Sequence, residues 1–169
     1  ANYYELVCTY FRNSNLTSYI RYVNRFAILL EEKLEQDSTA INIYIEAINT
    51  WRNKKGKDNI DYASLANSLA ETDEENNQLT KADSLYQEAK IILKKIVGKY
   101  DYGYASVIFN LAHLQKKLGN LDLAEQYFLE VAEIDSVTIG EHHPDYIDYT
   151  LLTLANFYDL KNEPLKANK

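Results

Sequence analysis

The chain has 169 residues, of which 46% are apolar, and it contains only five Gly and two Pro, which favours long helices and argues against an all-β fold. The longest apolar stretch near the start, residues 26–30, is far shorter than the roughly 18 residues of a membrane span, and no secretory signal is visible, so we expect no membrane contact from this segment. The net charge of −7 is concentrated in residues 121–169, which carry ten acidic and three basic residues, and such a surface repels nucleic acid.

Apolar residues recur at spacings of three and four in a series of segments that are separated by short polar turns. This periodicity predicts helices over residues 2–12, 17–34, 38–53, 60–74, 79–97, 102–118, 121–137 and 144–161, followed by a last helix that is cut off at residue 169. Turns are predicted at residues 13–15, 54–58 and 119–120, and glycines at 98 and 140 are expected to end helices.

One set of residues returns about every 42 positions along the chain. Small residues recur at Ala40, Ala82, Ala124 and Ala167, rings at Tyr44, Tyr86 and Phe128, and glycines at Gly56, Gly98 and Gly140. A stack of equal supersecondary units explains this fixed spacing, because each unit buries its apolar face only against its neighbours. We interpret the Ala as the point where two helices cross closely and the ring as the filler between one unit and the next.

Residues 60–160 resemble the tetratricopeptide repeat family, most closely through FNLA at residues 109–112 and LGNLDLAEQYF at residues 118–128. The 42-residue period and IGEHHPD at residues 139–145 are similar to the long-helix variety of kinesin light chains and bacterial signalling arrays. The resemblance implies an all-α fold, a right-handed superhelix of antiparallel helix pairs. It divides a single array into a partial helix at 1–12, repeats at 17–56, 59–98 and 102–140, and a truncated repeat at 144–169.

The resemblance also implies that the first helix of each pair lines a concave groove, which in this family usually holds a peptide or a helix of a partner protein. The candidate groove residues are Tyr22, Arg25 and Phe26 in the first repeat, Asn67 and Glu71 in the second, Phe109, Asn110 and His113 in the third, and Tyr149 and Asn156 in the fourth. Amides in this set can pair with the backbone of a bound strand, and rings can seat apolar side chains. For each residue, packing against a neighbouring unit stays open as the alternative.

No catalytic residue, metal site or cofactor is expected. The sequence contains no nucleophile motif or phosphate loop, and the lone Cys8 is interpreted as a buried side chain. The pair His142-His143 lacks a third ligand and fits an inter-repeat turn. The acidic run at residues 71–75 lacks the alternating ligands and the glycine of a calcium loop.

We therefore expect a non-catalytic protein–protein interaction scaffold or adaptor that binds a protein or peptide. The alternative is a sensory or regulatory segment of a larger signalling protein that controls an attached catalytic or DNA-binding domain, and a third interpretation is self-association through uncapped apolar ends. The acidic last third would attract a basic partner segment, although we give plain solubility more weight. The chain has no Met, which indicates a processed chain or a fragment, and a cytoplasmic location is favoured.

Overall fold

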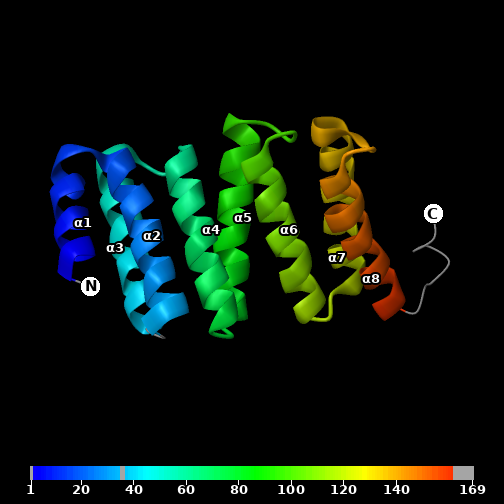
Figure 1. Ribbon diagram of the computed structural model, residues 1–169, viewed down its shortest axis with the longest axis horizontal. Helices are drawn as coiled ribbons and strands as arrows, with labels where there is room; N and C mark the ends of the chain where they lie inside the picture. Colours follow the sequence, from blue (N-terminus) through cyan, green and yellow to red (C-terminus); the bar gives the residue numbers. More distant parts are fainter. Residues whose placement is uncertain (1, 35–36, 162–169) are drawn as a thin grey trace. The chain divides into compact units, whose positions relative to one another are not determined.

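The computed structural model describes residues 2–34 and 37–161, and helices account for nearly all of this part of the chain (Figure 1). The elements are α1 (Asn2–Ser14), α2 (Leu16–Leu34), α3 (Asp37–Lys55), α4 (Ile60–Glu75), α5 (Leu79–Ile96), α6 (Tyr102–Lys117), α7 (Leu121–Asp135), η1 (Ser136–Gly140), η2 (Tyr146–Leu151) and α8 (Leu152–Leu160). No strand occurs within the described ranges, so the all-α fold class is confirmed. The last predicted helix lies outside the described residues, as does Ala167.

The chain divides into two compact units, an N-terminal unit that ends at Ile96 and a C-terminal unit that begins at Val97. In the N-terminal unit, neighbouring helices pack in chain order, α1 on α2, α2 with α3, α3 on α4 and α4 with α5, and α2 also contacts α4. In the C-terminal unit, α6 packs with α7, and the continuous helix formed by η2 and α8 packs on α7. Each unit therefore contains the antiparallel helix pairs that the repeat predicts.

The residues that define the 42-residue period form the core. The small residues Ala40, Ala82 and Ala124 are each 0% exposed. The rings that follow them, Tyr44, Tyr86 and Phe128, are all buried as well. Since protein interiors are close-packed, a larger side chain at the Ala positions would have to displace a neighbouring helix.

The first helix of each pair begins at a cap that follows the same period. Asn59 accepts a hydrogen bond from the backbone N–H of Tyr62 (2.8 Å), and Asp101 accepts one from that of Gly103 (2.8 Å). A further 42 positions along, Nδ1 of His143 accepts from the backbone N–H of Asp145 (3.2 Å). These side chains satisfy backbone donors that have no partner within the helix, so His143 has a structural role at the start of η2.

Two segments of the C-terminal unit depart from ordinary helical winding. The sequence predicted regular helices there, but α7 passes into the π-helical η1, and the π-helical η2 precedes α8. Hydroxyl groups compete for backbone carbonyls at this point, since Ser136 donates to Glu133 O and Thr138 donates to Ile134 O, both at 2.9 Å. Gly140 ends η1 with a φ of +92°, a conformation that glycine adopts without a steric cost.

A partly buried tyrosine–glutamate hydrogen bond joins the two helices of a pair, and it also repeats at the 42-residue period. The hydroxyl of Tyr62 donates to Glu88 Oε2 (3.2 Å), and that of Tyr104 donates to Glu130 Oε1 (2.8 Å). Burial, together with the hydrogen bond to Glu130 and its charge, raises the pKa of Tyr104 well above its usual range. Tyr104 therefore stays protonated and remains a donor.

Replacing Tyr104 with Phe is expected to lower the free energy of unfolding by about 0.5–1.5 kcal/mol, because Glu130 loses its donor. The measurement is urea unfolding of Tyr104→Phe, Glu130→Gln and the double variant. The two substitutions should be strongly non-additive. Full additivity would show that this hydrogen bond does not link α6 to α7.

Candidate functional site

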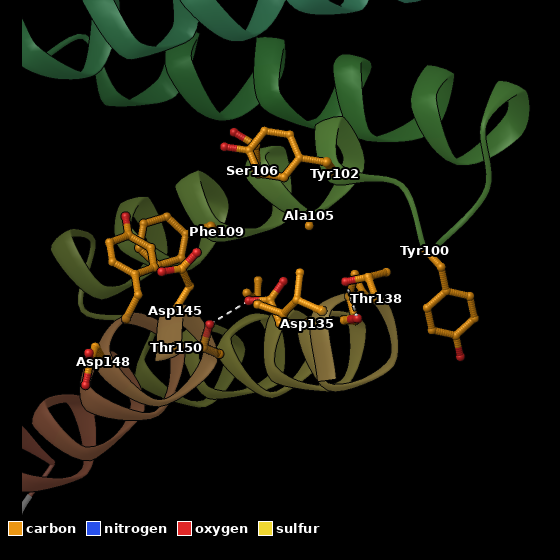
Figure 2. Close-up of a pocket in the computed structure, with 14 residues that line it drawn as sticks. Tyr100, Tyr102, Ala105, Ser106, Phe109, Asp135, Thr138, Asp145, Asp148 and Thr150 are labelled. Carbon is orange, nitrogen blue, oxygen red and sulfur yellow. Dashed lines mark hydrogen bonds between the residues drawn. The ribbon is translucent and has the colours of Figure 1, made fainter. Parts of the chain in front are cut away.

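The C-terminal unit contains a pocket of about 730 Å³, which is within the range of about 300–1,000 Å³ that is usual for ligand sites (Figure 2). We call it the C-terminal pocket. Its fourteen lining residues are Tyr100, Tyr102, Ala105, Ser106, Phe109, Val131, Ile134, Asp135, Thr138, Ile139, Asp145, Asp148, Tyr149 and Thr150. They come from α6 and the turn before it on one side, and from α7, η1, η2 and the turn before η2 on the other.

Aromatic side chains form much of the wall. The rings of Phe109 on α6 and Tyr149 on η2 stack with centroids 5.3 Å apart and planes at 29°. Tyr102 is 89% exposed and Tyr149 is 59% exposed, so neither ring is buried in the hydrophobic core. Exposed aromatic rings around a hollow are typical of binding surfaces.

The opposite wall is acidic. Asp135 accepts a hydrogen bond from the hydroxyl of the buried Thr150 (2.6 Å), which ties the end of α7 to η2 (Figure 2). Asp145 and Asp148 are both exposed, and Asp145 lies 3.6 Å from Nδ1 of His143, with which it pairs only when that histidine is charged. Among the described residues that line the pocket, none is basic.

Both π-helical segments contribute to the C-terminal pocket, η1 through Thr138 and Ile139 and η2 through Asp148, Tyr149 and Thr150. A π turn changes which residues of a helix face its neighbour, and such turns occur often at functional sites. Asp148, one of the three acidic residues of the wall, therefore lies on local winding that the sequence pattern did not indicate.

The structure brings together three of the five predicted groove residues of this unit. The ring of Phe109 lies 4.5 Å from that of His113 and also stacks on Tyr149. Asn110 is half-buried and Asn156 is exposed, and neither of them lines the pocket. The predicted set thus contains two lining residues, Phe109 and Tyr149, and one residue, His113, that packs behind them.

The five predicted residues of the N-terminal unit lie on α2 and α4. Tyr22 stacks on Phe11 at 5.0 Å, Arg25 is exposed and Phe26 is buried. On α4, Asn67 donates to Glu71 Oε1 (2.9 Å), so these two side chains hold each other one turn apart. Partner binding by all five residues stays a prediction.

Sequence reasoning missed the acidic residues of the C-terminal pocket. The excess of acidic residues after position 121 was visible, but nothing indicated that Asp135, Asp145 and Asp148 face one hollow. In the described residues, no group of three or more His, Cys, Asp or Glu side chains could hold a metal ion. None of the described helices is long and apolar enough to span a membrane.

Residues 105–138 match the tetratricopeptide repeat family. The resemblance seen in the sequence is confirmed. The solved structures that this chain is similar to include BtubC (BKLC) from P. vanneervenii, with a TM-score of 0.85 and 18% identity, over 98% of this chain and 66% of that one. Another is a Podosopora anserina protein described as a kinesin light chain with nearly identical TPR-like repeats, with a TM-score of 0.81 and 16% identity, over 91% of this chain and 72% of that one.

Because the identities are low, these likenesses show the fold alone. This chain spans slightly less than two thirds of the BtubC structure. No curated protein matches the chain. Tetratricopeptide repeats are generally non-catalytic protein-interaction scaffolds that offer an extended surface to their partners.

His113 gives this site a predicted pH dependence. Burial between rings, and secondarily the charge of Lys116, lower the pKa of His113 below its ordinary value of 6.5. The unfolded chain therefore binds the proton more tightly, and stability should fall as the pH drops through about 6.5 toward the lower folded pKa. We expect the thermal midpoint to fall between pH 7.5 and 5.5, and to fall less in His113→Gln. The exposed His142 provides the control variant, His142→Gln, and an unaltered pH profile in His113→Gln would contradict this account.

Proposed function

We propose that this chain is a non-catalytic protein-interaction module whose C-terminal pocket receives an extended segment of a partner protein. The observation that carries the proposal is the hollow between α6 and η2, whose wall includes the exposed rings of Tyr102 and Tyr149. These elements are the first helices of the third and fourth repeats, and Phe109 and Tyr149 occupy the positions that the family resemblance assigns to partner contacts.

The chemistry of the pocket suits a peptide. Rings and aliphatic side chains offer an apolar surface, while Ser106, Thr138 and the acidic residues offer polar groups around it. Binding sites commonly combine a mainly apolar surface with a few polar groups that fix orientation. An extended segment can use such groups along its backbone and place alternate side chains in the hollow.

The properties of the lone cysteine favour a binding role over catalysis. Cys8 is buried, and this burial raises the pKa of its thiol, although the charge of Arg12 opposes the shift. A protonated and inaccessible thiol is a poor nucleophile. Together with the fold, this supports a module that binds and does not transform its partner.

The predicted groove residues of the N-terminal unit extend the proposal to a second surface. Arg25 is exposed on α2, and Asn67 and Glu71 form their hydrogen bond on α4, which α2 contacts. Contacts of these residues with a partner are proposed for the N-terminal unit by itself. Self-association through the ends of the array stays a separate prediction.

The proposed function is tested by panning the chain against a random library of short peptides. The wild-type chain is expected to enrich a consensus sequence. Tyr149→Ala and the double variant Phe109→Ala with Asn110→Ala should lose it, because they remove the stacked rings. Tyr149 is 59% exposed, so its replacement should leave the helical circular dichroism unchanged.

The matched control is Gln126→Ala with Leu129→Ala, two exposed residues of α7 that do not line the pocket. This variant should keep the consensus. Enrichment that survives in Tyr149→Ala and in the Phe109 and Asn110 double variant would count against the C-terminal pocket as the binding site.

A further inference from the structure

We infer that the C-terminal pocket selects an arginine side chain within the partner segment. The inference rests on the proposed function and adds the chemistry of the residue that is recognised. It is carried by three carboxylates, a set of exposed rings and the absence of any basic group among the described lining residues.

All the charged side chains among the described lining residues are acidic. Asp135, Asp145 and Asp148 line the hollow, and the nearby Lys99 is held by Glu133 through an ion pair of 2.6 Å. Asp135 accepts a hydrogen bond from the hydroxyl of Thr150, a neutral donor that brings no positive charge to this wall. An incoming cation is therefore attracted by several charges, while an acidic side chain is repelled.

The two outer carboxylates are accessible to a partner. The side chain of Asp145 is 80% exposed, and its carboxylate lies 3.6 Å from Nδ1 of His143. Asp148 is exposed on η2, one residue before Tyr149, and both residues line the pocket. A partner cation at this rim can contact a carboxylate and a ring at the same time.

The exposed rings of the pocket favour an arginine side chain over a lysine side chain. A guanidinium group is planar, stacks on aromatic faces and forms paired hydrogen bonds with carboxylates. Tyr102 on α6 is 89% exposed and Tyr149 on η2 is 59% exposed, so each ring has a face that a partner cation can reach. Lysine would gain the charge attraction but would lose the planar stacking and the paired hydrogen bonds, so we expect arginine to bind more tightly.

A metal ion is a poorer candidate for this acidic wall. Within residues 2–34 and 37–161, no three acidic, His or Cys side chains gather closely enough to hold one. Carboxylates that are spread along a wall with rings between them suit a larger organic cation. The volume of the pocket leaves room for the residues on either side of the arginine.

The test uses short peptides of mixed flanking sequence whose central residue is Arg, Lys, citrulline or Glu, with binding measured by fluorescence anisotropy at low and high salt. Citrulline keeps the shape of arginine without its charge. We expect the order Arg, Lys, citrulline, Glu, with arginine binding roughly tenfold more tightly than citrulline and weakening as salt rises. Free argininamide serves as a competitor and should bind far more weakly than the peptide, because it lacks the flanking contacts.

The decisive variant is Asp145→Asn with Asp148→Asn, which should remove the preference for arginine and weaken binding of the Arg peptides roughly tenfold. The control, Glu75→Gln with Asp159→Asn, changes the net charge equally at two exposed residues outside the pocket and should keep the preference. Tyr102→Ala should reduce the advantage of Arg over Lys, while Tyr102→Phe should keep it.

The outcomes separate this inference from the proposed function. Peptide binding without a preference for arginine, or a preference that survives in Asp145→Asn with Asp148→Asn, would overturn the inference and leave the binding module standing. Equal affinity for free argininamide and the Arg peptides would point to a small-molecule site and would also overturn it. The absence of binding to any peptide would overturn both.

Discussion

The close crossing of paired helices at a single small side chain is the constraint on which the rest of the structure depends. Ala40, Ala82 and Ala124 are fully enclosed, and each is followed one turn later by a buried ring. Since each of these methyl groups is fully buried among packed helices, we expect the position to tolerate little increase in volume. Because the crossing returns every 42 residues, the same helix pair forms again along the chain.

Within a helix pair, two faces of the first helix have different roles, as α6 shows. Tyr104 on α6 is buried and bonded to Glu130 on α7, whereas Tyr102, two residues earlier, is 89% exposed. One face of α6 thus packs against α7, and residues of another face are exposed to solvent. The hollow beside α6 is lined by such available groups, and its acidic lining is the basis of the preference for arginine that we propose.

Much of the fold could be predicted from the sequence because the repeat carries the same information several times. The period located the helices to within a few residues and placed Ala82, Ala124 and Phe128 in the core. It also placed Phe109 and Tyr149 on the first helices of their repeats, and these two rings stack in the pocket. A periodic pattern can specify the position of a residue within its repeat.

The rest of the site depends on features that occur once. The winding of η1 and η2 sets which side chains face the hollow, and it arises from local hydroxyl groups such as that of Thr138 and from the turn at Gly140. A regular helical period therefore could not predict that Asp135 and Asp148 line the same pocket. The pairing of Tyr104 with Glu130 follows the repeat, but the sequence alone did not show that two such distant residues meet.

The most direct test of this account is the free energy of unfolding of Ala124→Leu, measured by urea denaturation beside Gln126→Leu. Leucine at the buried crossing should cost about 1–3 kcal/mol, because α6 and α7 must move apart to accept it. The same leucine at the exposed position 126 should change stability by no more than about 0.5 kcal/mol. Equal stability of Ala124→Leu and the unaltered chain would contradict the claim that a small side chain sets the spacing of the helices.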